Sequence, residues 1–175
     1  MKGTRVPWVH LLRFKKAVPR YSFILWLAIK ERLTTQDKLV KIGLKQGMSC
    51  VLCREHIENH DHLFFQCSFS NRIWRVLLAK CGWQCPEPSW QGVIQWAIQQ
   101  MHGNSLKSSL GKLILSTTVY TIWNERNART FSNSYKDVVS VLHDIISLIR
   151  SRVIGGKVFP LSEVNRHLKQ EWRLL

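Results

Sequence analysis

Acidic residues are scarce in this sequence: Asp and Glu together number 11, against 26 Lys and Arg. The acids stand singly along the chain, so neither the carboxylate cluster of a two-metal nuclease nor a paired general acid and base is recognisable. A Ser-His-Asp pattern and a phosphate-cradling glycine motif are also missing. We therefore expect a protein without catalytic activity.

Long uncharged apolar runs are missing too. The stretch Tyr21–Ile29 has only nine residues between two basic ones, which is too short to span a bilayer. Lys and Arg interrupt every early apolar run, so no secretory signal is visible. The basic, acid-poor start suits a mitochondrial transit peptide, but Trp8 and Pro19 disfavour the regular amphipathic helix that one requires. We expect no membrane partner and a nuclear or cytoplasmic protein.

Cysteine is too sparse for a disulfide framework. There are five cysteines in 175 residues, and four of them lie between positions 50 and 81. Such local clustering favours metal binding in a reducing compartment.

The metal ligands predicted from this cluster are Cys50, Cys53, His62 and Cys67. The close pair Cys50/Cys53 suits a short turn that aims two sulfurs at one ion. His62 and Cys67, five residues apart, suit a helical turn that ends and lets the chain curl back. Three thiolates and one imidazole fill a tetrahedral Zn²⁺ site and leave no open position, so we expect structural rather than catalytic zinc.

Several alternatives remain open around these ligands. The cysteines could be buried thiols beside a surface histidine, and His60, which looks solvent-facing, could replace His62. Asp61 or Glu58 could accept the second imidazole proton of the ligating histidine, or both could be merely solvated. The pair Cys81 and Cys85 is interpreted as packing, although an exchange of ligands is conceivable.

The net charge of +15, with a pI near 10.1, attracts phosphate polyanions without regard to sequence. The alternative explanation of this net charge is a basic surface that only contacts solvent. In residues 1–49 the basic side chains are opposed only by Glu31 and Asp37. The candidates for gripping an RNA or DNA backbone are Arg13, Lys15, Lys16, Arg20, Lys38 and Lys41. Trp8 or Phe14 could stack on an unpaired base, although core packing is the better explanation of these rings.

The apolar spacing predicts an all-α protein. Residues 21–33 are apolar on nearly all sides and predict a central buried helix, whereas residues 1–18 look irregular. Further helices are predicted from Thr34 or Thr35 to Ile42 and over residues 70–81, 90–101, 106–129 and 135–153. Pro86 and Pro88 mark a loop, Gly155 and Gly156 end the last helix, and the tail is only weakly patterned.

These residues also resemble a known family. The segments that carry the resemblance are Arg20–Trp26, Arg32–Asp37, Cys50-x2-Cys53, Glu58, Asp61–Phe65 with Cys67, and Ile73-Trp74. Over residues 6–80 they look like the reverse-transcriptase zinc-binding domain of plant non-LTR (LINE-type) retrotransposons. The segment Tyr120–Arg129 resembles a helical part that often follows this domain.

The resemblance implies zinc on the four ligands named above and nucleic-acid handling beside a reverse transcriptase, which could act in trans. The Tyr-x-Asp-Asp motif of the polymerase and the acids of an RNase H domain are absent, so the chain looks like a truncated or domesticated remnant. We expect a small helical zinc-binding domain over residues 1–85, a long-helix hairpin as an extension over 86–155, and a basic tail over 156–175. A scaffolding domain with purely structural zinc, or a remnant without function, are the alternatives.

Overall fold

The fold was analysed in a computed structural model. The structure describes residues 6–44, 47, 49–84, 87–154, 159–160 and 162–174. Within these ranges the regular structure is helical, and the one β-type pairing is an isolated bridge between Ser49 and Ile57. The prediction of an all-α protein is therefore confirmed. None of the helices found in these ranges is long and apolar enough to cross a membrane.

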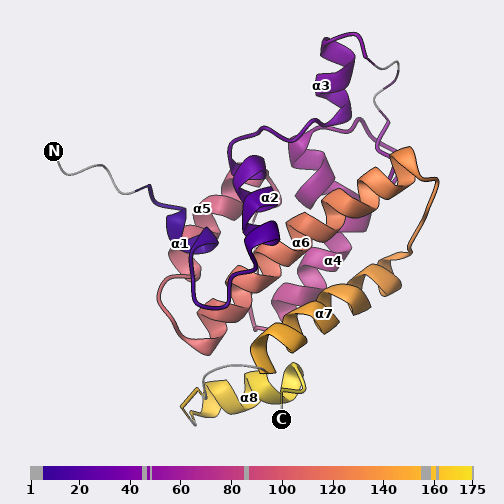
Figure 1. Ribbon diagram of the computed structural model, residues 1–175. Helices are drawn as coiled ribbons and strands as arrows, with labels where there is room; N and C mark the ends of the chain where they lie inside the picture. Colours follow the sequence, from indigo (N-terminus) through magenta and orange to yellow (C-terminus); the bar gives the residue numbers. More distant parts are fainter. Residues whose placement is uncertain are drawn as a thin grey trace, which may run out of the picture.

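The central element is helix α6, Leu106–Phe131 (Figure 1). It packs against α1 (Val9–Leu12), α2 (Pro19–Ile29), α4 (Ser68–Ala79), α5 (Trp90–Gln100), α7 (Val138–Ile154) and α8 (Glu163–Glu171). Residues 110–119 are all buried, on every side of the helix. Small side chains allow this close packing, and a Cβ at Gly111 would come within 2.5 Å of the Trp83 ring.

The prediction that residues 21–33 form the central buried helix is wrong. Helix α2 ends at Ile29 and buries one face through Tyr21, Leu25 and Ala28, while Phe23 is 56% exposed. A uniformly apolar composition cannot tell a core helix from a surface helix, because exposed apolar residues are common in folded proteins. The central buried helix is α6, although it contains more Ser and Thr than α2.

The remaining helices agree more closely with the sequence. Helices α3 (Gln36–Lys41), α4, α5, α6 and α7 lie within a few residues of their predicted ranges. Thr35 is the N-cap residue of α3, but its hydroxyl donates to the Asp37 carboxylate rather than accepting a backbone N–H. The short helix α1 and the C-terminal helix α8 were not predicted. The predictions for Cys85, Pro86, Gly155 and Gly156 lie outside the described residues.

Helices α6 and α7 form the predicted long-helix hairpin (Figure 1). Two contacts fix its connection: Arg129 donates to the backbone oxygen of Lys136 at 2.6 Å, and the Lys136 backbone N–H donates to Glu125 at 2.8 Å. One apolar cluster extends from Leu11 through the residues around Cys50 and Cys67 to Trp172. The core is thus continuous across the boundaries predicted at residues 85 and 155.

Candidate metal centre

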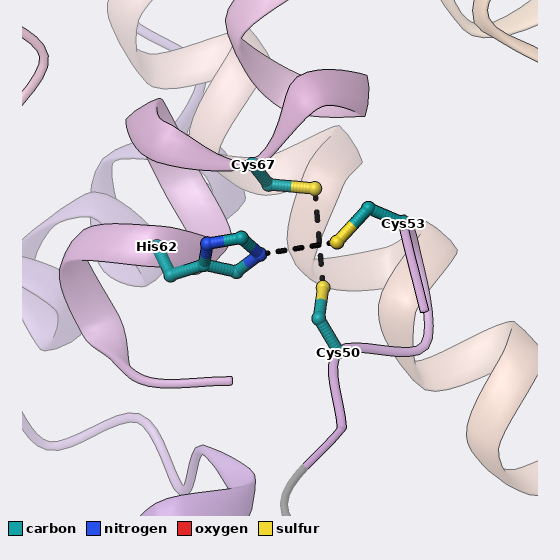
Figure 2. A group of neighbouring side chains, drawn as sticks. All are labelled: Cys50, Cys53, His62 and Cys67. Carbon is teal, nitrogen blue, oxygen red and sulfur yellow. Dashed lines mark hydrogen bonds between the residues drawn. The ribbon is translucent and has the colours of Figure 1, made fainter. Parts of the chain in front are cut away.

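The first pair of ligands lies on a tight turn between residues 49 and 57. The Cys50 N–H donates to the backbone oxygen of His56, and the Arg54 N–H donates to that of Cys50, each at 2.8 Å. Arg54 has a φ of 63°, which reverses the chain within this turn. As a result the side chains of Cys50 and Cys53 converge on a common point (Figure 2).

The second pair lies on a π-helical turn, η1, formed by His62–Gln66. The Cys67 N–H donates to the backbone oxygen of His62 at 2.7 Å, which is the i to i+5 bond of a π-turn. In an α-helix of 3.6 residues per turn, residues five apart lie about 140° apart around the axis. The π-turn brings His62 and Cys67 to one side of the chain. The five-residue spacing of these two ligands therefore requires a π-turn and not an α-helical turn.

The four predicted ligands meet at one point. The donor atoms of Cys50, Cys53, His62 and Cys67 all lie within 4.8 Å of one another. The Cys50 and Cys67 sulfurs are 3.9 Å apart, and the Cys53 sulfur is 3.3 Å from Nε2 of His62. These two contacts cross, so the four donors surround a common centre (Figure 2).

This arrangement fits a tetrahedral zinc ion. With bonds of about 2.3 Å to sulfur and 2.0–2.1 Å to nitrogen, the edges of the tetrahedron are about 3.8 Å between sulfurs and about 3.6 Å between sulfur and nitrogen. The two observed contacts lie within a few tenths of an ångström of these lengths. Cys50, His62 and Cys67 are buried and Cys53 is half-buried, as in a closed structural site.

The protonation of these side chains also suits a metal. Cys50 donates to Cys67, and this bond together with burial raises the pKa of Cys50. The same bond lowers the pKa of Cys67, so its thiolate is the favoured first anion of the pair. Burial, and then the nearby His56, lower the pKa of His62. Its imidazole is therefore neutral at physiological pH, which is the form that coordinates a metal.

A second set of donors shares one ligand with this site. Cys53 also lies close to Glu55 and His56, both of which are exposed on the turn. Three donors, two of them in solvent, form a weaker site than four donors that are mostly buried. The complete set is therefore the better candidate for a resident ion.

His60 is not a member of the ligand cluster. Its ring lies against those of Phe64 and Trp90, with centroids 5.1 and 4.4 Å away. Burial lowers its pKa to about 4. The prediction of a solvent-facing His60 is wrong, and among the two candidate histidines the structure places His62 with the cysteines.

Asp61 and Glu58 are engaged by other groups. Asp61 accepts the backbone N–H of Trp90 at 2.7 Å, at the start of α5. Glu58 is fully buried, accepts the backbone and side-chain N–H groups of Gln36, and forms an ion pair of 2.8 Å with Arg126. The interpretation of both acids as solvated is therefore wrong. Glu58 joins α3, the ligand segment and α6 instead.

A second arginine of α6 holds the metal turn directly. Arg129 donates to the backbone oxygens of Val51 and Leu52 at 3.3 and 3.1 Å, between the two cysteines. Glu125, one helical turn earlier, orients Arg129 through a 2.8 Å ion pair. The sequence signal was the group of charged residues Glu125, Arg126 and Arg129 near the end of α6. A role for these residues beside the metal was not predicted.

Cys81 is separate from the ligand cluster. It is 3% exposed at the end of α4, and burial raises its pKa to about 11. A buried neutral thiol agrees with the packing interpretation.

The predicted nucleic-acid-binding residues fall into two groups. Arg13, Lys15, Arg20 and Lys41 are exposed. Lys16, in contrast, is 8% exposed, and its ammonium group donates to the backbone oxygens of Arg152 and Val153, at the end of α7. Lys38 donates to the backbone oxygens of Glu31 and Leu33. These internal contacts do not suit Lys16 or Lys38 for gripping a phosphate.

The fold and the site together define a helical module with a candidate metal centre of three cysteines and one histidine. Residues 1–74 match the model of the family described as zinc-binding in reverse transcriptase. This first part of the chain is thus similar to the zinc-binding module of reverse transcriptases, and no catalytic reverse-transcriptase domain is detected. Searches of curated proteins and of solved structures returned no significant match.

Proposed function

We propose that this protein is a non-catalytic, zinc-stabilised module that contacts RNA or DNA through a basic face. The basic face comprises Arg13, Lys15, Arg20 and Arg152, all of them exposed. Arg152 uses Nε and one Nη for backbone contacts, and the other N–H groups of its guanidinium can still donate to a phosphate. Arg13 and Lys15 follow α1, Arg20 lies in the first turn of α2, and Arg152 lies in the last turn of α7.

Reciprocal contacts hold the two parts of this face together. Lys16 donates to the end of α7 at 3.0 Å, and Arg152 donates to the backbone oxygens of Lys16 and Ala17 at 2.9 and 3.0 Å. The segment that carries Arg13 and Lys15 is therefore fixed beside Arg152. A segment held in place in this way suits a phosphate backbone, because little backbone entropy remains to be lost on binding.

The observation that carries the proposal is the lack of acidic partners on this face. Within the described part of the chain, ion pairs neutralise residues such as Arg126, Arg129 and Lys136, but none includes a member of the basic face. Exposed cations without acidic partners release counterions when they bind phosphates, which is the main source of sequence-independent affinity.

A salt titration of the zinc-loaded chain tests this proposal. Affinity for mixed-sequence single-stranded RNA and for duplex DNA is measured by fluorescence anisotropy over a range of salt concentrations. Log K is expected to fall linearly with log salt, by about 0.7 per phosphate contact for a single strand. Arg13→Gln combined with Lys15→Gln should reduce that slope by about 1.4. Arg72→Gln combined with Arg75→Gln, which removes two exposed charges of α4 outside the basic face, is the matched control.

A flat dependence on salt, or equal losses in the double variant and the control, would refute the basic face. RNA and DNA are compared side by side because the face has no feature that distinguishes them. A reverse transcriptase acting in trans is the protein partner that we infer from the family match alone.

A scaffolding role is the second candidate, and one observation favours it. Large apolar side chains are exposed around the α6–α7 connection: Phe131 is 74% exposed, Tyr135 50% and Val139 69%. If they form a docking surface, the chain should self-associate or bind a protein partner with an affinity that is insensitive to salt. Size-exclusion chromatography at several concentrations and salt levels separates this function from the first.

A further inference from the structure

A cavity of about 480 Å³ lies where the N-terminal segment meets the loop between α5 and α6. Its polar side chains are those of His10, Arg13, His102, Asn104 and Lys112. Four of these five are basic, and no acid lines the cavity. The rings of His10 and His102 are 5.1 Å apart. Basic groups gathered without an acid repel one another, so a cavity built in this way attracts an anion.

Lys112 is the strongest sign of a missing anion. It is 2% exposed, and its ammonium group donates to the backbone oxygen of Gly103 at 2.6 Å and lies 5.6 Å from the centre of the Phe14 ring. Among the described ion pairs none includes Lys112. Burial lowers its pKa, as expected for a charge that has lost water without gaining a carboxylate.

His10 has an unused polar atom beside this charge. Its Nε2 is buried without a hydrogen-bond partner. Burial, Lys112 and His102 together lower the pKa of His10. An anion in the cavity would reverse this effect, because it would favour the protonated ring and accept its N–H.

We propose that this cavity binds a phosphate group, held by Arg13, His10, His102 and Lys112. Tetrahedral oxyanions suit several donors arriving from different directions, and the planar guanidinium of Arg13 can donate two N–H groups. The inference deepens the proposed function, on which it rests for its source of phosphate: a nucleic-acid strand that passes the basic face.

A neighbouring cavity provides room for the rest of a nucleotide. It has a volume of about 390 Å³ and shares Asn104 with the phosphate cavity. Phe14, Phe159 and Lys15 are among its lining residues. An aromatic ring beside a cation is the usual platform for an unpaired base. The pair of cavities therefore fits single-stranded nucleic acid better than a duplex.

NMR of the histidine rings in the zinc-loaded full chain tests the phosphate site. Inorganic phosphate is titrated against chloride at constant ionic strength and pH. The rings of His10 and His102 are expected to shift in a saturable way with phosphate, and the pKa of His10 should rise, while His143 and His167 stay unchanged.

Two variants separate binding from folding. Lys112→Met keeps the aliphatic volume and removes a buried charge, and the Gly103 oxygen can still share the Ser108 hydroxyl proton with the Met101 oxygen, so the chain should fold. Arg13→Gln alters an exposed side chain. Each should weaken the phosphate response at least about tenfold, whereas Arg72→Gln should not. Absence of a selective phosphate shift, or a response that survives Lys112→Met, overturns the phosphate site.

The same samples, titrated with single-stranded RNA, distinguish this inference from the proposed function. Salt-dependent RNA binding with no change at His10 overturns the phosphate site and leaves the basic face. A saturable phosphate response without RNA binding supports the site, assigns it to a free phosphate compound, and overturns the proposed function.

Discussion

At the scale of single residues, two histidines two positions apart have different roles. His62 lies with three sulfurs, whereas His60 packs between Phe64 and Trp90. The spacing Cys-x2-Cys, His and Cys was sufficient to predict which four side chains the fold brings together. The environment of His60 could not be predicted, because its flanking residues Asn59 and Asp61 are polar and only the fold brings Trp90 against its ring.

We predict opposite phenotypes for the two alanine variants. His62→Ala should lose the metal, because three ligands leave the ion open to water and chelators. His60→Ala should retain the metal but lose about 1–3 kcal/mol of unfolding free energy, through lost aromatic packing. Visible absorption of the Co²⁺-substituted protein reports the first effect and urea unfolding the second. A reversed pattern would identify His60 as the ligand.

Arg129 is predicted to control metal affinity although it does not touch the metal. Arg129→Gln removes the donors to Val51 and Leu52, so the cysteine turn should become less well ordered. Loss of such outer contacts typically lowers metal affinity about 10–100-fold. Competition with a chromophoric chelator measures the change, and Arg72→Gln is the control. Equal affinities in Arg129→Gln and the unaltered chain would show that the turn is ordered without its arginine.

At the scale of elements, α6 joins parts that the sequence suggested were separate. Residues 75 and beyond lie outside the family match, yet Arg126 and Arg129 of α6 contact Glu58 and the metal turn. Helical periodicity predicted where α4, α5, α6 and α7 lie. It could not predict that α6 is central, because partners such as Glu58 and Arg126 are 68 positions apart.

We therefore predict that residues 1–85 alone do not reproduce the zinc-loaded domain. Without α6 the Glu58 carboxylate is left without its arginine, and the apolar face of α2 loses its main neighbour. The fragment should show a broad thermal transition by circular dichroism and weaker zinc binding than the full chain. A cooperative transition and an unchanged zinc affinity in the fragment would show that the first 85 residues form an independent domain.

At the scale of the whole molecule, the metal and the fold should depend on each other. Structural zinc contributes about 10–16 kcal/mol of apparent binding free energy in small peptides, and an ordinary domain is stable by only about 5–15 kcal/mol. The ligands lie in the same apolar cluster as α4 and α6, so loss of the ion should disturb more than the local turn.

We expect a chelator to unfold at least residues 20–80. Helical circular dichroism should fall, the thermal transition should move to lower temperature or broaden, and added zinc should restore both. Cys53→Ala should behave like the chelated protein. A melting curve that does not change after complete metal removal would mean that packing around α6 is sufficient for the fold.

The most direct measurement of the central claim is zinc K-edge X-ray absorption on the purified chain. We predict one zinc ion per chain, with three sulfur neighbours at about 2.3 Å and one imidazole nitrogen at about 2.0–2.1 Å. Absence of zinc, or a first shell dominated by oxygen or with fewer than three sulfurs, would contradict it.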